Sequence, residues 1–276
     1  MKKILYVIMI VMICSALIGC SAHTATSDDT GNSSVSNARI ANPISDFEYS
    51  IDSNTDQCVI AKYIGESTTV IIPEEIEGYP VTLIGSLSFM NSNIQYVDIP
   101  DTVEKICQHA FCNCKELTTL KMGHGTKYIE NQAFEKCVSL KNLTLSKNLL
   151  KIGTNAFRYC ENLETVFIPK TVETWGMEAF FGCPLSTLTF ENGIKSIGSY
   201  ACFWGSTFKE ITIPSSVEEI GEYTFHDNLE KVVFWGNAPT TLGKQPFGTK
   251  ATIYHKKGTT GWDNTSLKDI YKLIAQ

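Results

Sequence analysis

The chain has 276 residues, and its 23 basic and 29 acidic side chains give a formal net charge of −6 at pH 7. Hydrophobic residues make up 43% of the sequence and charged residues 19%, a balance that supports a buried core and excludes a chain that is disordered throughout. The acidic balance and the presence of only two arginines argue against a nucleic-acid-binding surface, which needs a basic patch.

The N-terminal segment has the pattern of a bacterial targeting signal. Two lysines precede an apolar run over residues 4–17, which is too short to cross a membrane as a helix but has the length of a signal-peptide core. The run leads into Leu-Ile-Gly-Cys, which ends at Cys20 and resembles the bacterial lipobox. The resemblance implies cleavage before Cys20 and attachment of diacylglycerol, commonly with a further acyl chain such as palmitate, as a stable anchor. Two alternatives stay open: an ordinary signal peptide with an incidental cysteine, and an uncleaved anchor.

Residues 21–45 are predicted to be a flexible tether. They are rich in Ser, Thr, Asn and Asp and show no apolar periodicity, so they cannot bury enough surface to offset the entropy of ordering. A flexible chain of about 25 residues has a root-mean-square span of roughly 25–30 Å. Such a tether would lift a folded domain off a lipid surface.

A unit of 22 or 23 residues recurs along the rest of the chain and reads I-G-x-x-A-F-x-x-C-x-x-L-x-x-L-x-L. The leading apolar residues of its seven copies are Ile84, Ile106, Ile129, Ile152, Trp175, Ile197 and Ile220. Five residues after each of these stand Phe89, Phe111, Phe134, Phe157, Phe180, Cys202 and Phe225. A unit this short cannot bury its own apolar face, so we expect the copies to stack into a solenoid.

The second half of each unit is predicted to be a β-strand. Segments such as 143–145 and 211–213 alternate apolar and polar residues, and an Ile-Pro pair ends the strand in several copies. An earlier Ile72-Pro73 pair indicates a degenerate copy before residue 81. The first half, with Gly at a bend before Ala-Phe, favours one short helical turn that directs the phenylalanine inward. Stacked copies would then form a parallel sheet with a column of phenylalanines behind it.

These motifs resemble the BspA-like, or Treponema-type, leucine-rich repeats, and the resemblance runs from about residue 47 to the C-terminus. Residues 60–65 and 76–81 resemble the capping strands of that family, and residues 251–262 resemble its C-terminal cap. The resemblance implies a leucine-rich repeat solenoid, with a parallel β-sheet on the concave face, short helical turns or extended segments on the convex face, and a cap at each end. It also implies a bacterial surface protein that adheres to host or matrix proteins or to other bacteria.

The chain is accordingly divided into five parts. These are a lipoprotein signal peptide (1–20), a disordered tether (21–45), an N-terminal cap with a degenerate repeat (46–80), the repeats of 22–23 residues (81–237) and a C-terminal cap (238–276). For the C-terminal tail, the spacing of Leu267, Ile270, Tyr271 and Ile274 favours a helix, with Asn264 or Thr265 as its N-cap. A final extended strand is the alternative. In either form the tail should cover the last rung, around Phe225, Val232 and Phe234.

Four cysteines share one position of the repeat: Cys114, Cys137, Cys160 and Cys183. Stacking places them in a buried column, where a free cysteine behaves as a small apolar residue. Two alternatives stay open, namely a disulfide that involves Cys58 or Cys112, and a metal pair at Cys112 and Cys114. No His or second Cys pair recurs at zinc-ligand spacing around that pair.

Sequence motifs of catalytic chemistry are missing. The chain contains no H-E-x-x-H, G-x-S-x-G or C-x-x-C, and the glycines before Lys244 are too widely spaced for a phosphate loop. The five histidines are scattered, and His226 is expected at the rim of the repeat. We therefore expect no enzymatic activity, no cofactor and no metal site.

A partner-binding strip is predicted on the outer face of the strands, because side chains alternate between the two faces of a strand. The strip is rich in threonine, and Tyr96 and Phe167 would be its aromatic anchors. The alternative is that threonine stands there only because exposed strand positions favour it. The candidate binding residues are Tyr96, Asp98, Thr119, Lys121, Asn142, Thr144, Thr165, Phe167, Thr187, Thr189, Glu210 and Thr212.

The leading hypothesis is a monomeric, lipid-anchored protein of the cell envelope that faces outward and binds another protein through this strip. Its only contact with the membrane would be the lipid. One alternative is a binder of glycan or cell-wall polymer, in which Tyr96, Phe167 and Trp235 would stack on sugar rings. Another is a purely architectural component of the envelope.

Overall fold

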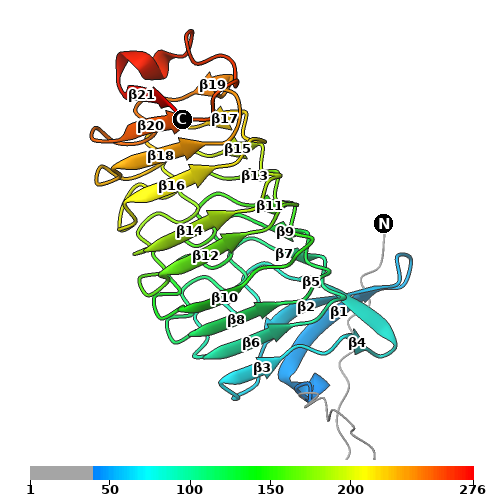
Figure 1. The fold of residues 1–276 in the computed structure, drawn as a ribbon. Coiled ribbons are helices and arrows are strands. Elements are labelled where there is room, and N and C mark those ends of the chain that lie inside the picture. Colours follow the sequence, from blue (N-terminus) through cyan, green and yellow to red (C-terminus); the bar gives the residue numbers. More distant parts are fainter. Residues whose placement is uncertain (1–39) are drawn as a thin grey trace, which may run out of the picture. The chain divides into compact units, whose positions relative to one another are not determined.

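A computed structural model describes residues 40–276 of the chain. The predicted signal peptide, the lipidation site at Cys20 and most of the predicted tether lie outside the described residues. Residues 40–276 form a stack of coils in which strands of successive coils lie side by side on two sides of the stack (Figure 1). Within the described residues, no helix has the length and apolar character that a membrane span requires.

The second half of each repeat unit forms a strand, as predicted, and we call these the long strands. They pair in parallel and in register, so that Val97 of one strand lies opposite Leu120 of the next. One sheet holds β3 (Thr69–Ile71), β6 (Tyr96–Ile99), β8 (Thr119–Met122) and β10 (Asn142–Thr144). A second holds β12 (Thr165–Ile168) and β14 (Thr187–Phe190). A third holds β16 (Glu210–Ile213), β18 (Lys231–Phe234), β20 (Thr252–His255) and β21 (Lys272–Ala275).

The leading residues of the units form a second set of two-residue strands, which we call the short strands. They pair in parallel along the other side of the coils (Figure 1). Their bounds are β7 (Lys105–Ile106), β9 (Tyr128–Ile129), β11 (Lys151–Ile152), β13 (Thr174–Trp175), β15 (Ser196–Ile197), β17 (Glu219–Ile220) and β19 (Thr241–Leu242). The glycine that follows most of them permits close stacking, because a Cβ at Gly153 would lie only 2.6 Å from the carbonyl carbon of Glu130.

The helical turn expected after each short strand does not form in the described copies. Left-handed residues stand two positions before and two after Phe157, namely Asn155 at φ 56° and Tyr159 at φ 58°, and a right-handed helical turn excludes that conformation. The amides of Asn155, Phe157 and Tyr159 instead donate to carbonyls of the next coil at 2.8–2.9 Å. These hydrogen bonds between coils offset the cost of the left-handed residues.

The N-terminal cap consists of strands that cover the first coil. After the short 3₁₀ turn η1 (Ile44–Asp46), β1 (Phe47–Asp52) and β2 (Gln57–Tyr63) form an antiparallel hairpin. β2 pairs in parallel with β5 (Tyr79–Ile84), against which β4 (Glu75–Ile76) folds back. β3 lies beside β6, so the degenerate copy expected before residue 81 is present. Residues 40–45, expected to belong to the tether, contact the cap: the side-chain oxygen of Asn42 accepts a hydrogen bond from the Ile71 amide at 2.8 Å.

The core is a column of stacked rings, as predicted. Neighbouring phenylalanines from Phe89 to Phe180 have ring centroids 4.6–5.2 Å apart and planes within 15° of parallel. Tyr63 of the cap extends the column at one end, 5.3 Å from Phe89. Cys202 interrupts it, and the column resumes where Phe225 stacks on Phe247 at 5.7 Å.

Phe247 belongs to an eighth copy of the unit, so the repeat continues past residue 237. This copy reads Leu-Gly-Lys-Gln-Pro-Phe over residues 242–247, with Leu in place of Ile and Pro in place of Ala. Those two replacements hid it from the sequence pattern. Its long strand, β20, pairs in register with β18.

The helix favoured for the C-terminal tail is wrong, and the alternative of a final strand holds. A single 3₁₀ turn, η2 (Ser266–Asp269), follows Thr265. Thr265 is its N-cap, as predicted, and the Thr265 side chain accepts a hydrogen bond from the Leu267 amide. The chain then extends as β21, because pairing with the open edge of β20 gives its backbone hydrogen bonds that a short amphipathic helix would not. Ile270, expected on the buried helix face, is 47% exposed.

The tail covers Phe234 of the rung expected around Phe225, Val232 and Phe234, and it also covers a further ring, Phe247. The hydroxyl of Tyr271 accepts a hydrogen bond from the Phe247 amide at 3.2 Å, and the two rings lie 5.9 Å apart. Trp262 packs on Phe234 at 5.0 Å. The terminal ring of the core is therefore Phe247, and Tyr271 closes the column.

The cysteine column is structural. All eight described cysteines are free. In the four that share the repeat position, the thiol lies 3.0–3.4 Å from the carbonyl oxygen of the phenylalanine of the preceding coil and donates to it. Burial raises the pKa of the Cys114 thiol to about 12, so this thiol is protonated and unreactive at neutral pH.

Candidate binding surface

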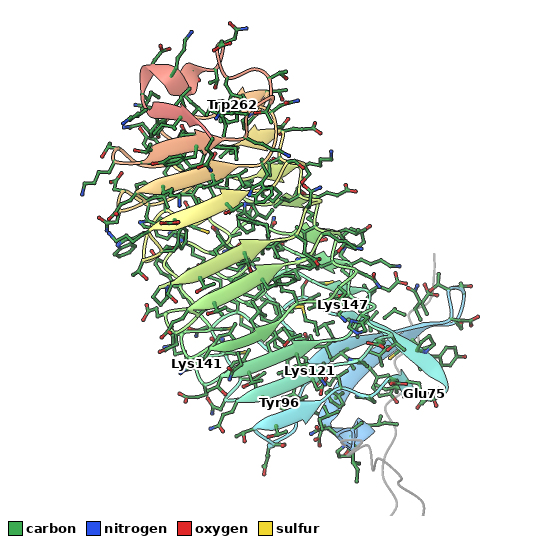
Figure 2. The ribbon with its side chains drawn as sticks, viewed as in Figure 1. Glu75, Tyr96, Lys121, Lys141, Lys147 and Trp262 are labelled. Atoms are coloured by element: carbon green, nitrogen blue, oxygen red, sulfur yellow. The ribbon has the colours of Figure 1, made fainter. Side chains whose placement is uncertain are left out.

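The long strands carry all twelve candidate binding residues on their solvent face. Burial alternates along each strand, as in β12 and β16, where every second residue is buried and the residues between them are exposed. Figure 2 shows Tyr96 and Lys121 on this side of the coils. The structure therefore confirms that these residues share one face, whereas their role in binding stays a prediction.

The N-terminal end of the strip holds polar groups that bind one another. The Tyr96 hydroxyl donates to Asp98 at 3.0 Å, and Lys121 forms an ion pair with the same carboxylate at 3.3 Å. On the next strands, the Asn142 amide donates to the Thr119 hydroxyl at 3.2 Å. The polar side chains at this end already have hydrogen-bond or ion-pair partners within the strip, so a partner protein that binds there would have to replace these contacts.

The middle of the strip exposes an aromatic ring among hydroxyl groups. Phe167 of β12 is 54% exposed, and its register partner on β14 is Thr189. Thr165 and Thr187 form the preceding pair of the same two strands. Removing an exposed phenylalanine ring from water is favourable. A partner that covers Phe167 would therefore gain more binding free energy here than elsewhere on the strip.

A cavity opens one strand away from this ring, at one of the two interruptions in the sheet of long strands. β14 ends one sheet and β16 begins the next, and a cavity of about 300 Å³ lies between them. Its lining includes Thr189, Phe208, Glu210 and Thr212. The sequence analysis missed the cavity, and unit length gives no signal for it, because the copy that begins at Ile84 has 22 residues like the one that begins at Trp175, and its strand β6 pairs in register with β8.

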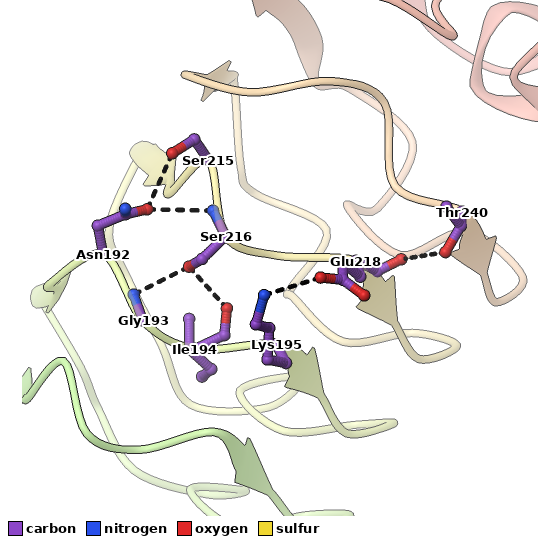
Figure 3. Close-up of polar contacts among 8 residues, drawn as sticks. All are labelled: Asn192, Gly193, Ile194, Lys195, Ser215, Ser216, Glu218 and Thr240. Atoms are coloured by element: carbon purple, nitrogen blue, oxygen red, sulfur yellow. Dashed lines mark hydrogen bonds and ion pairs between the residues drawn. The ribbon is translucent and has the colours of Figure 1, made fainter.

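The bends between long and short strands are closed by polar contacts from one coil to the next (Figure 3). The side-chain oxygen of Asn192 accepts hydrogen bonds from the Ser215 hydroxyl and the Ser216 amide, both at 3.0 Å. Lys195 forms an ion pair with Glu218 at 2.8 Å. These groups are occupied in holding coils together, which leaves the strand face as the surface free for a partner.

A second exposed aromatic cluster lies at the turns after the phenylalanine column. Trp204 is 61% exposed and packs edge-on against Phe181 at 5.7 Å and Tyr159 at 6.5 Å. Arg158 lies over the Tyr159 ring at 4.7 Å and pairs with Glu178 at 3.0 Å. Sequence reasoning missed this cluster, although an aromatic residue one or two positions after the column residue recurs in three successive copies.

The three rings proposed to stack on sugars are not brought together. Tyr96, Phe167 and Trp235 lie on or directly after β6, β12 and β18, so three strand steps separate each ring from the next. At ~4.8 Å per step the rings are roughly 14 Å apart, too far to form one stacking platform. Each ring would have to act alone.

Titratable groups of the described residues form no reactive cluster. No group of three or more His, Cys, Asp or Glu side chains in residues 40–276 is placed to hold a metal ion. His226, expected at the rim, is buried 4.9 Å from the Phe208 ring, and its Nδ1 accepts the amide of Asn228. Burial lowers the pKa of His226, which favours the neutral ring.

Comparison with known proteins places the repeats in one family. The model described as BspA type leucine rich repeat region matches the chain in six copies, over residues 82–203 and 166–257. No curated protein is similar enough to the chain to match.

Three solved structures resemble the chain. A leucine-rich repeat protein of T. pallidum has a TM-score of 0.58 and 27% identity, over 74% of this chain and 86% of its own. A leucine-rich cell surface protein from Faecalibacterium prausnitzii has a TM-score of 0.48 and 20% identity, over 79% of this chain and 76% of its own. A leucine-rich repeat protein from Bacteroides capillosus has a TM-score of 0.38 and 27% identity, over 55% of this chain and 98% of its own. Of these three, the T. pallidum structure supports the solenoid fold.

Proposed function

The chain belongs to the BspA-type leucine-rich repeat family, and from that premise we propose that it binds another protein through the outer face of its long strands, at the surface of a bacterial cell. The observation that carries the proposal is the exposed ring of Phe167, which stands among threonines, and its register partner Thr189 also lines a cavity of about 300 Å³. A flat polar face with one apolar anchor matches the anatomy of a protein interface, in which a few buried rings contribute most of the affinity.

The character of the strip supports a protein partner over a sugar polymer. Thr165, Thr187, Thr189 and Thr212 present hydroxyls that both donate and accept, which suits main-chain and side-chain groups of a polypeptide. A glycan site would need rings close enough to stack on neighbouring sugars, and Tyr96 and Phe167 are several strands apart. An architectural role would leave the exposure of Phe167 without a purpose.

The cellular location is part of the proposal. Cys20 ends a segment that resembles a lipobox, and a diacylglyceryl group there would hold the chain to the membrane. The F. prausnitzii structure is described as a cell surface protein, which fits the same location. In a Cys20→Ser variant we expect the protein to leave the membrane fraction, and a variant that is still processed and membrane-bound would contradict the anchor.

The binding proposal is tested by using the protein to capture partners from host-matrix and bacterial surface extracts. Two variants are compared with the wild type, and each of them loses one exposed aromatic ring. Phe167→Ser removes the exposed ring of the strip, and Trp204→Ser removes a ring of similar exposure at the turns. We expect the wild type and Trp204→Ser to retain the same protein, and Phe167→Ser to lose at least about tenfold of it, as hot-spot truncation does.

Other outcomes are also informative. Capture that survives in Phe167→Ser would contradict the role of the strip. Capture that is lost only when the retained protein is deglycosylated would favour the glycan alternative. The absence of any retained protein from all extracts would favour the architectural alternative.

A further inference from the structure

The two ends of the described chain carry opposite charge. Residues 40–81, which form the N-terminal cap, contain eight acidic side chains and one basic side chain, a net charge of −7. Residues 238–276, which form the last coil and tail, contain six lysines and two acidic side chains, a net charge of +4. Figure 2 shows Glu75 and Trp262 in these two opposite regions of the stack.

The coils between the two ends have a different arrangement of charge. There, 13 basic and 17 acidic side chains are interspersed over residues 82–237. Seven ion pairs join neighbouring coils in this region, such as Lys127 with Glu104 at 3.1 Å and Lys209 with Glu230 at 3.0 Å. Seven of the 13 basic side chains of the middle are thus paired with an acidic side chain of a neighbouring coil, and neither sign is gathered at one place.

The basic end lacks such neutralisation. Within the described residues, none of its six lysines forms an ion pair, and all six are exposed. These are Lys244, Lys250, Lys256, Lys257, Lys268 and Lys272. The end also exposes an apolar side chain, Ile270, at 47%. It is therefore a positively charged surface with an apolar residue among the lysines.

The acidic end has the complementary composition. Glu48, Asp56, Glu66 and Glu74 are exposed, and so is Glu75 at the hairpin of β4 and β5. This end exposes Ile44 at 42% and Ile64 at 49%. It is a negatively charged surface that also contains apolar residues.

We propose that copies of this chain associate end to end, with the basic C-terminal end of one copy against the acidic N-terminal end of the next. Complementary single-sign charge steers two surfaces together and fixes their orientation. The two surfaces lie at opposite ends of the stack of coils, so contact between them places successive copies one after another along the stack. The contact is between two different surfaces and does not close, so it produces short linear chains.

A second copy accounts for more of the observations than an unrelated anionic polymer does. A polymer would match the lysines alone and leave the opposite charge of the other end unexplained. Lys272 lies on the edge strand β21, where a charged residue opposes unspecific pairing of the sheet edge. An acidic partner surface would neutralise this side chain and so select one kind of neighbour. The proposal goes beyond binding through the strip and differs from the monomer expected from the sequence.

The test uses the purified full chain in one mild detergent and measures weight-average mass by light scattering. At ~0.01 M salt, where charges act over ~30 Å, we expect a mass above that of the monomer that rises with protein concentration. At ~1 M salt, where the range falls to ~3 Å, this excess should be lost. A mass that stays monomeric at low salt, or an excess that does not respond to salt, would overturn the proposal.

Charge-reversal variants identify the surfaces. One variant changes Lys256, Lys257, Lys268 and Lys272 to Glu, and a second changes Glu48, Glu66, Glu74 and Glu75 to Lys. Each variant alone should lose association, because both of its ends then carry the same sign. An equimolar mixture of the two should recover it, because every end then finds an opposite one.

A matched control keeps the net charge of the first variant but changes lysines of the middle coils. These are Lys115, Lys141, Lys147 and Lys170, all exposed and outside the described ion pairs. Association should persist in this control, while melting curves confirm that each variant is folded. Loss of association in the control, or failure of the mixture to recover it, would contradict the end-to-end contact. Capture of a partner by the strip is measured separately, so either proposal can fail alone.

Discussion

The coils from Phe89 to Phe180 and the coils after them obey the same repeat but differ in how continuous they are. In the first group the rings stack without interruption at 4.6–5.2 Å. In the second, Cys202 replaces a ring, and a cavity opens between β14 and β16, whereas the break of the sheet between β10 and β12, inside the first group, leaves the ring column continuous. Regular repeats therefore build the scaffold, and the cavity lies at the coil in which Cys202 replaces the column ring.

The strongest perturbation of the second group is removal of its cap. Deleting residues 262–276 takes away β21 and Tyr271, which leaves the edge of β20 unpaired and the Phe247 ring uncovered. We expect aggregation, measured by light scattering, because an open strand edge beside an exposed core pairs with other chains. The conservative Tyr271→Phe variant, which keeps the ring, should remain dispersed. A truncated chain of unchanged melting temperature and dispersion would show that the tail is not the cap.

Removing one ring tests the continuity of the first group. Phe157 lies between the Phe134 and Phe180 rings, each at 5.2 Å, and Phe157→Ala should lower the free energy of unfolding by ~3–5 kcal/mol. Phe225 stacks on Phe247 at 5.7 Å and meets the Phe208 ring edge-on at 6.3 Å, both farther than the neighbours of Phe157, so Phe225→Ala should cost less, by ~0.5–1.5 kcal/mol. Chemical denaturation of both variants measures the difference. Equal costs would mean that the interruption at Cys202 has no energetic consequence.

Two cysteines, one from each group of coils, allow the same comparison with a smaller expected change in the free energy of unfolding. The Cys160 thiol donates to the Phe134 carbonyl at 3.4 Å, whereas the Cys202 thiol has no hydrogen-bond partner among the described residues. Both side chains are fully buried, so alanine removes the same volume at each site. Cys160→Ala should therefore be the more destabilising, by ~0.5–1.5 kcal/mol of lost hydrogen bond. The reverse order in denaturant melts would show that the thiol contact does not stabilise the first group.

The smallest effect concerns acid. Because burial lowers the pKa of His226 in the folded state, the unfolded chain takes up the proton first as pH falls below ~6.5. The free energy of unfolding should then decrease with falling pH and be unaffected by this group above that value. His226→Gln should flatten the dependence over the same range. A wild type and variant with identical pH profiles would contradict the assignment.

Much of the fold follows from the sequence because its period is direct evidence of stacking. The inward column that includes Phe157 and the alternation that exposes Phe167 are consequences of repeat spacing and strand geometry. Left-handed residues such as Tyr159 were not predictable, because hydrogen bonds to the next coil hold them against the local preference of a bulky side chain.

Two other features, the conformation of the C-terminal tail and the cavity between β14 and β16, depend on contacts between coils that the repeat pattern does not specify. The C-terminal tail has helical spacing, but the open edge of β20 offered it a strand partner, and tertiary pairing prevailed over local periodicity. The cavity between β14 and β16 has no counterpart in the repeat pattern, because units of 22 residues also occur where the long strands pair without a break. The sequence therefore predicts which residues share the solvent face of the long strands, but it does not predict the cavity at that face.

The central claim is that a protein partner covers the strip of long strands, and radical footprinting of the captured complex tests it most directly. Phe167 and Trp204 are two oxidisable rings with 54% and 61% exposure on different surfaces, so each serves as the reference for the other. The account predicts that the partner slows oxidation of Phe167 and leaves that of Trp204 unchanged. Protection of Trp204 with Phe167 unaffected would contradict it and would place the partner at the turns.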